Sequence, residues 1–175
     1  QYLKSALRLL PLLRQPDERS SIRTRRDLVR MARVEAAPGI LRAFQYTPGA
    51  LTVLDQGPIY TLTTLLDLVG EGEPESRLKT WWAAKARQLA GLVDTVVWLE
   101  APDEVLIERI RSRPKDHLLK DKPPAAAQAS LALHRQRFEQ TIAQMRLSGE
   151  LRLLCLDTTR RSPQEIAGDI LTLVA

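Results

Sequence analysis

Three apolar runs of the sequence each end on a carboxylate. Asp55 closes "LTVLD", Glu100 closes "VVWLE" and Asp157 closes "LRLLCLD". Apolar runs without strict alternation are typical of strands buried on both faces, and ligands of open α/β sheets bind at the carboxyl ends of the strands. A carboxylate placed there can accept a proton or bind a cation. Asp55 has a second interpretation, because it can instead cap the helix that is predicted to follow from Pro58.

Arginines dominate the N-terminal part of the chain. Residues 1–49 contain 10 Lys and Arg against 4 Asp and Glu, whereas residues 50–175 contain 16 against 17. Arg26, Arg30 and Arg33 are spaced i, i+4, i+7, which places them on one face of a predicted helix. Such a row can bind a phosphate, or it can simply face water. The sequence therefore predicts a basic helical region over 1–49 and leaves both roles open.

Predicted helices alternate with three predicted strands along the chain. The strands cover 50–55, 94–101 and 151–157, and a segment with helical character follows each of them. Near-continuous apolar strands that alternate with helices indicate parallel pairing, with helices on both faces of the sheet. We therefore predict a single α/β domain over 1–175, built on a three-layer open parallel sheet.

A second group of cations follows the strand at 94–101. The predicted helix 102–113 carries Arg109 and Arg113 four residues apart, and the charged segment 114–124, bracketed by prolines, cannot continue that helix. These arginines can contact a ligand, or they can lie in solvent at a helix end, where cations suit the helix dipole. The pattern predicts an exposed loop over 114–124.

The last predicted strand leads into "DTTRRSPQEIAGDIL". Ser162 and Glu165 have the spacing of a capping box, which predicts the start of the final helix. Thr158, Thr159 and Arg160 lie between the strand and that helix. They are therefore candidates to contact a ligand at the carboxyl end of the sheet.

The single cysteine and the hydropathy bear on the compartment. Cys155 cannot form a disulfide within the chain, which favours a reducing compartment such as the cytoplasm, and its place in an apolar strand predicts a small core residue. No apolar run approaches the roughly 20 residues that a membrane span needs. We therefore predict a soluble cytoplasmic protein without a membrane span.

Taken together, these segments resemble the nucleoside and nucleotide kinases of the P-loop group, with thymidylate-kinase-like proteins nearest. The resemblance rests on "LDQG", "VVWLEAPDEVLIERIRSR" and "CLDTTRRSPQEIAGDIL", and it covers roughly residues 50–175. It implies a P-loop kinase fold with ATP as the phosphoryl donor, Mg²⁺ as the metal and a small-molecule substrate as the acceptor.

The resemblance implies a catalytic role for the end of the first predicted strand. Asp55 is the candidate to hold Mg²⁺ through a water molecule or to accept a proton from the attacking oxygen. Related kinases usually have arginine at the next position, where it contacts the substrate phosphate or the catalytic centre, whereas this chain has Gln56. Gln56 is therefore the substrate-binding candidate there, and its uncharged amide binds the phosphate of a nucleoside monophosphate less strongly than an arginine would.

The other implied residues surround ATP and the acceptor. Arg109 and Arg113 are expected to contact ATP during catalysis, with 112–124 as a lid that closes over it. The resemblance also implies that Thr158, Thr159 and Arg160 form a loop on the nucleotide side. Within 1–49, it implies that Arg26, Arg30 and Arg33 form a row on the acceptor side.

One motif of the resembled group does not occur in this sequence. The chain has no G-x-x-x-x-G-K-[ST] loop, which cradles phosphates, and its eight glycines are scattered. In such folds the strand before that loop is central, and its loss would leave the buried strands on either side without backbone partners. We therefore expect a fragment whose phosphate-cradling segment lies upstream or on another chain. The alternative is an unexpected element, such as a partner's strand, in the sheet.

These observations support one leading function and two alternatives. The leading prediction is an ATP-dependent phosphotransferase acting on a nucleoside, a nucleotide or another small hydroxyl compound. The alternatives are a catalytically inactive nucleotide-binding module, which Gln56 supports, and a basic interaction domain that binds an anionic partner through residues 4–33. Nucleic acid is not expected, because no aromatic residue is interleaved with the basic ones. A homodimer is left open.

Overall fold

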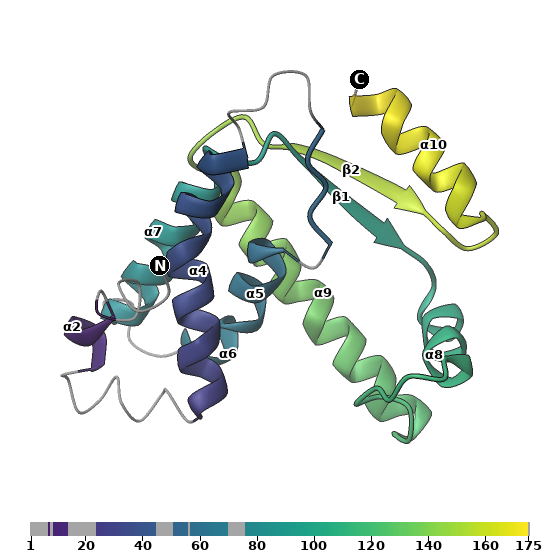
Figure 1. Ribbon diagram of the computed structural model, residues 1–175. Helices are drawn as coiled ribbons and strands as arrows, with labels where there is room; N and C mark the ends of the chain where they lie inside the picture. The colour runs from purple at the N-terminus through teal and green to yellow at the C-terminus, as the bar shows by residue number, and fades with distance from the viewer. Residues whose placement is uncertain are drawn as a thin grey trace. The chain divides into compact units, whose positions relative to one another are not determined.

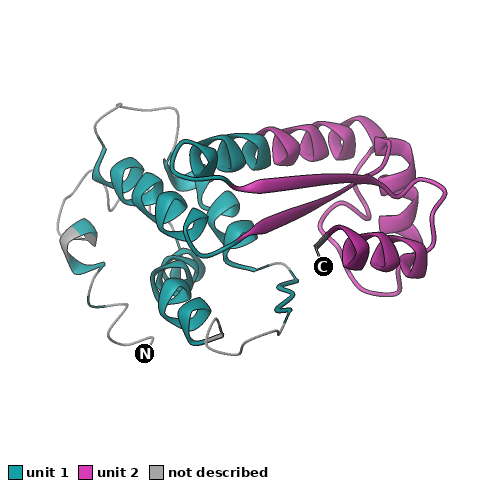
Figure 2. Ribbon diagram, turned by 90° about the horizontal axis from the view of Figure 1, so that it is seen from above, with its two compact units in different colours: residues 1–93, 137–150 teal, residues 94–136, 151–175 magenta. Residues whose placement is uncertain are grey.

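A computed structural model describes residues 7, 9–13, 24–44, 51–55, 57–69 and 76–174. Gln56 and most of the chain before Thr24 therefore lie outside the described residues. The chain divides into two compact units, which Figure 2 shows in different colours. Unit 1 comprises residues 1–93 and 137–150, and unit 2 comprises residues 94–136 and 151–175. The single domain over 1–175 stays a prediction.

Helices provide the regular structure of the described part of unit 1 (Figure 1). They are α2 (Leu10–Leu13), α4 (Arg25–Phe44), α5 (Pro58–Thr64), α6 (Leu66–Val69), α7 (Arg77–Ala90) and the end of α9 (Pro124–Arg146). Helices α4, α5 and α7 pack against one another, and α6 packs against α5 and α7. The helix predicted after Pro58 is thus confirmed, with an interruption at Leu65.

The core of unit 1 lies among these helices. Its fully buried side chains include those of Met31, Val34, Leu62, Leu65, Leu78, Leu89 and Met145. Trp82 is also buried, and its Nε1 donates a hydrogen bond of 3.0 Å to the carbonyl oxygen of Leu62, which ties α7 to α5. Thr63 donates a hydrogen bond of 3.1 Å to the hydroxyl of Thr141, so two buried polar groups satisfy each other.

The buried strand predicted over 50–55 is wrong for the described residues of that segment. Residues 51–55 form no strand and are exposed, Val53 by 76%. A strand needs a neighbour to pair with its backbone groups, and the sheet of the described residues contains two other strands only. Apolar composition alone does not supply that neighbour, so the segment leaves its backbone open to water.

Unit 2 contains a two-stranded parallel sheet. Strand β1 (Thr95–Glu100) pairs with β2 (Arg152–Asp157), so that Glu100 lies opposite Asp157. Helix α8 (Asp103–Ser112) and α9 lie between the two strands in the chain, and α10 (Pro163–Val174) follows β2. The predictions of strands at 94–101 and 151–157, and of their parallel pairing, are confirmed.

Strand β2 is less buried than the sequence predicts. Cys155 is exposed, so its assignment as a small core residue is wrong. That assignment assumed a strand buried on both faces. In the described residues, however, no residue of β2 is fully buried. The thiol of Cys155 is therefore exposed.

Helix α8 ends one residue earlier than predicted. Its last residue is Ser112, and Arg113 has an extended backbone with φ −68° and ψ 139°. Pro114 explains this end, because the residue before a proline is disfavoured in the helical conformation. Arg109 and Arg113 therefore do not share one helix face, which corrects the prediction. Residues 113–123 contain no helix or strand, as expected for a loop, and their role as a lid stays a prediction.

The observed class is mixed α/β and mostly helical, with one two-stranded parallel sheet in the described residues. The α/β class is thus confirmed at this level. None of the described helices combines the length and the apolar composition that crossing a bilayer demands.

Candidate anion-binding site

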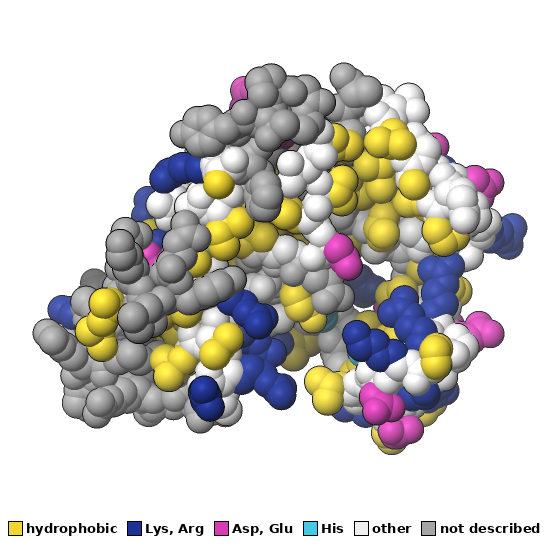
Figure 3. All heavy atoms as spheres, viewed as in Figure 1, with side chains coloured by type: hydrophobic (Ala, Val, Ile, Leu, Met, Phe, Trp, Pro, Cys, Tyr) yellow, Lys and Arg dark blue, Asp and Glu magenta, His cyan; other side chains and the backbone are white. Residues whose placement is uncertain are grey.

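An open pocket of about 700 Å³ is formed by α4 and α5 in unit 1. The described residues that line it, called the arginine pocket below, are Arg25, Arg26, Val29, Arg30, Arg33, Tyr60, Thr61 and Thr64. Figure 3 shows Lys and Arg side chains, in dark blue, gathered over the lower part of α4. A volume of this order suits a small molecule, and guanidinium groups match the geometry of phosphate and carboxylate.

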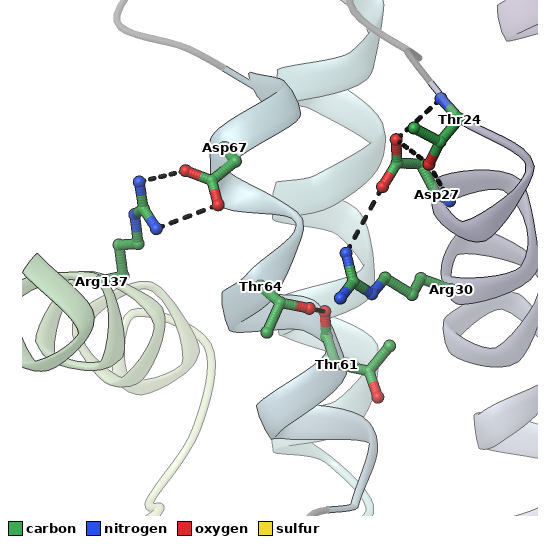
Figure 4. Close-up of polar contacts among 7 residues, drawn as sticks. All are labelled: Thr24, Asp27, Arg30, Thr61, Thr64, Asp67 and Arg137. Carbon is green, nitrogen blue, oxygen red and sulfur yellow. Dashed lines mark hydrogen bonds and ion pairs between the residues drawn. The ribbon is translucent and has the colours of Figure 1, made fainter. Parts of the chain in front are cut away.

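A capping box forms the start of α4, and one of its residues contacts an arginine of the arginine pocket (Figure 4). The backbone N–H of Asp27 donates to the hydroxyl of Thr24, at 3.2 Å, and the backbone N–H of Thr24 donates to Asp27 Oδ2, at 3.0 Å. The buried Asp27 also accepts a hydrogen bond of 3.4 Å from Arg30 through its other oxygen. The cap therefore fixes the first turn of α4 and holds one pocket arginine.

The other wall of the pocket comes from α5. Pro58 is the first residue of this helix, where the missing backbone N–H of proline costs nothing. Thr64 donates a hydrogen bond of 2.8 Å to the carbonyl oxygen of Thr61, and the hydroxyl of Thr61 donates one of 3.4 Å to the carbonyl oxygen of Gly57. Both hydroxyl groups thus use their proton within α5.

A buried ion pair ties α4 to α7. Glu35 is 8% exposed, and its Oε2 accepts from Lys85 Nζ at 2.8 Å and from Trp81 Nε1 at 3.0 Å. Sequence reasoning missed this contact, because its partners are 46 and 50 positions away along the chain. Together with the packing of α4 on α5, it holds the helix that carries the pocket arginines.

A second ion pair links α6 to α9 within unit 1. Arg137 contacts both carboxylate oxygens of Asp67, as Figure 4 shows. Asp67 is largely exposed, so this pair contributes little to the stability of the unit. It nevertheless favours one placement of α6 against the end of α9.

Asp55 lies in the exposed segment three residues before α5. Its carboxylate therefore faces solvent rather than the end of a buried strand. Among the described residues, no group of three or more His, Cys, Asp and Glu side chains could hold a metal ion. One exposed carboxylate does not form a magnesium site by itself, because Mg²⁺ needs near-octahedral oxygen coordination. Mg²⁺ and ATP both stay predictions.

The predicted nucleotide-side loop follows β2 in unit 2. Arg109 donates hydrogen bonds to the hydroxyl and the carbonyl oxygen of Thr158, at 2.9 and 2.6 Å, and to the carbonyl oxygen of Thr159, at 3.3 Å. The hydroxyl of Thr158 in turn donates to the carbonyl oxygen of Glu100, at 2.9 Å. Arg109 therefore positions this loop against the end of β1, and its contact with ATP stays a prediction.

The remaining loop residues border a second open hollow, of about 500 Å³. Thr159 and Arg160 line it together with Cys155, Leu156, Asp157 and Arg161. Arg113 does not join this group: it is exposed, and its carbonyl oxygen accepts a hydrogen bond of 2.8 Å from Lys120. Of the two arginines predicted to bind ATP, the structure thus brings Arg109 alone to the loop after β2.

Replacing Arg109 by alanine is expected to lower the free energy of unfolding by about 1.5–3 kcal/mol, because charge-assisted hydrogen bonds to the loop are lost. Arg113→Ala is the matched control and should leave stability within about 0.5 kcal/mol of the original, as surface substitutions do. Urea unfolding measures both. Equal small effects would show that Arg109 does not position the loop.

Acid pH is expected to destabilise the end of β2. The pKa of Asp157 is lowered by hydrogen bonds from the hydroxyl and then the backbone N–H of Thr159, and the pKa of Glu165 is lowered by the backbone N–H and then the hydroxyl of Ser162. A carboxyl group with a lowered folded pKa stabilises above its unfolded pKa and loses that stabilisation as pH falls through the folded value. The melting temperature should therefore decrease as the pH is lowered below about 4.

Thr159→Ala is the variant that separates this cause from general acid unfolding. It removes the hydroxyl that most lowers the pKa of Asp157, so its melting temperature should fall less between pH 6 and pH 2 than that of the original protein. An equal fall in both proteins would contradict the assignment.

Ser162 and Glu165, predicted as a capping box, do form one at the start of α10.

Three of the predicted site residues meet in the arginine pocket. Arg26, Arg30 and Arg33 line it together, as their helical spacing predicts. Sequence reasoning missed Arg25, although it lies beside this row, and also the three residues of α5: Tyr60, Thr61 and Thr64. Nothing in the sequence indicated the three residues of α5, because the sequence does not show that α5 packs against α4.

No family model matches this chain, and searches among curated proteins and solved structures found no match. The geometry of the arginine pocket and of the loop after β2 therefore carries the functional argument.

Proposed function

We propose that this protein is an ATP-dependent phosphotransferase that holds an anionic acceptor in the arginine pocket. The observation that carries the proposal is the convergence of Arg25, Arg26, Arg30 and Arg33 on one open pocket. Phosphoryl transfer depends on positioning and on cations near the transferred group, and arginine suits both needs.

The order of the elements in unit 2 supports the P-loop kinase type. The resemblance requires two parallel strand-and-helix units, and β1 with α8 and β2 with α10 have this order and pairing. The loop after β2 then contacts the nucleotide, with Thr159 and Arg160 beside it. The three-layer arrangement belongs to the same proposal.

The proposed reaction transfers the γ-phosphoryl group of ATP to a hydroxyl group of the acceptor. The acceptor oxygen forms a bond to phosphorus, the bond to the leaving oxygen of ADP breaks, and the hydroxyl proton passes to a base, for which Asp55 is the candidate. The 175 residues contain no G-x-x-x-x-G-K-[ST] motif, so the proposal assigns the acceptor pocket and the nucleotide-side loop to this chain and leaves the phosphate-cradling loop unassigned.

A second candidate is an anion-binding module without catalysis. The described lining residues of the arginine pocket include no carboxylate or histidine, which suits binding and gives no base inside the pocket. This candidate predicts binding of the same anions without turnover of ATP.

A transfer assay distinguishes the two candidates. The intact protein is incubated with ATP, magnesium chloride and one of two anionic acceptors, thymidine monophosphate or a hexose phosphate. Mass spectrometry then measures ADP and the phosphorylated acceptor. The proposal expects both products in equal amounts, and less of each with Arg30→Gln. Binding of an acceptor without ADP would favour the second candidate.

A further inference from the structure

The arginine pocket has an elongated cationic wall. Arg26, Arg30 and Arg33 follow one face of α4, and the last lies seven positions after the first. At the rise of an α-helix, their backbones are spread over about 10 Å along the helix axis. A single phosphate can contact part of such a row. Two anionic groups, one toward each end, can contact all of it.

The protein itself neutralises little of this charge. Arg30 contacts Asp27 at 3.4 Å. Within the part of the chain that the structure describes, no hydrogen bond or ion pair is made by the side chains of Arg25, Arg26 and Arg33. Neighbouring like charges repel one another, so a ligand with several negative charges gains more here than a singly charged one.

The α5 wall has the opposite hydrogen-bonding character. The hydroxyl protons of Thr61 and Thr64 are donated to carbonyl oxygens of α5, as Figure 4 shows for Thr64. A hydroxyl group has one proton, so in this arrangement each of these oxygens offers the ligand its lone pairs. They can accept hydrogen bonds from hydroxyl groups of a ligand.

We propose that the ligand of the arginine pocket is a small polyol that carries two phosphate groups. The phosphates lie along Arg26, Arg30 and Arg33, and ligand hydroxyl groups donate to Thr61 and Thr64. This inference rests on the proposed function, because it names the class of acceptor: a bisphosphorylated sugar or a similar compound with a free hydroxyl group.

A nucleic acid backbone also presents phosphates in a row, but the pocket favours the small ligand. Single-strand binders stack successive bases on aromatic side chains, and Tyr60 alone is aromatic among the described residues of the lining. An oligonucleotide is therefore a competing outcome of the test.

Isothermal titration calorimetry on the intact protein tests the inference with a matched pair of probes. Fructose 1,6-bisphosphate is expected to bind about tenfold or more tightly than fructose 6-phosphate, because a second phosphate adds charge-assisted hydrogen bonds. Arg26→Gln and Arg33→Gln should each reduce this ratio toward one. Arg42→Gln is the control, since Arg42 is an exposed residue of α4 outside the described lining.

Each other outcome overturns a stated part of the account. Equal binding of the two sugars would remove the two-phosphate ligand, while phosphoryl transfer to a monophosphate would leave the proposed function in place. Tight binding of the bisphosphate without any transfer from ATP would support the two-phosphate ligand and remove the proposed function. Tighter binding of an eight-nucleotide oligothymidylate than of the bisphosphate would make nucleic acid the ligand, and no binding of any probe would remove the site itself.

Discussion

Replacing Glu35 by alanine is expected to lower the free energy of unfolding by about 3–5 kcal/mol, because the largely buried Lys85 would lose its counter-charge and keep only its hydrogen bond to Gln88. The Lys85 side chain is 12% exposed, and the ion pair joins α4 to α7 at 2.8 Å. The variant also loses the hydrogen bond from Trp81. Urea unfolding followed by circular dichroism measures the change.

The double variant Glu35→Leu with Lys85→Met is the control for this prediction. Removal of both charges leaves no unpaired ion in the core, so the double variant should be more stable than Glu35→Ala. A double variant as unstable as the single one would show that the helices depend on shape at this position and not on the ion pair.

Replacing Asp55 by asparagine is expected to reduce the turnover of phosphoryl transfer by about 100-fold or more, because the proposed proton acceptor is lost. The substitution preserves shape in an exposed segment, so the melting temperature should change little. Steady-state kinetics with ATP and the best acceptor measure turnover.

Asp94→Asn is the matched control for Asp55→Asn. Asp94 is an exposed aspartate just before the first residue of β1, at the end of the strand opposite to Glu100. It should leave turnover unchanged. Unchanged turnover in Asp55→Asn as well would remove Asp55 from the mechanism, and an equal loss in both variants would point to a general charge effect.

Local signals in the sequence predicted most of the elements correctly. Strands at 95–100 and 152–157 follow from continuous apolar runs, and the start of α10 follows from the capping box of Ser162 and Glu165. Such signals act within a few residues of the chain, so one sequence is enough to read them. The same holds for the row of Arg26, Arg30 and Arg33.

Features that depend on distant parts of the chain were not predicted. The segment 51–55 has the composition of a strand, yet pairing depends on a neighbour that its own residues do not encode. Glu35 resembles a surface charge in sequence, and only the packing of α7 makes it a buried ion-pair partner. Arg109 similarly contacts residues 49 and 50 positions away.

Long-range contacts also determine what the arginine row can bind. The sequence predicts three arginines on one face of α4, and the structure adds the wall of α5, which limits the row to one pocket. The hydroxyl groups of Thr61 and Thr64 donate to carbonyl oxygens of α5 and its N-cap and can accept hydrogen bonds from a ligand. Together they change a general affinity for anions into a specific expectation about the ligand.

The most direct test of the anion site is an NMR titration of the ¹⁵N-labelled protein with inorganic pyrophosphate. The account predicts saturable shifts of the backbone amides of residues 25–33 and 60–64, and weaker binding with Arg30→Gln. Shifts confined to residues 155–161, where Arg160 and Arg161 line the second hollow, would contradict it. Unchanged spectra at saturating pyrophosphate would contradict it as well.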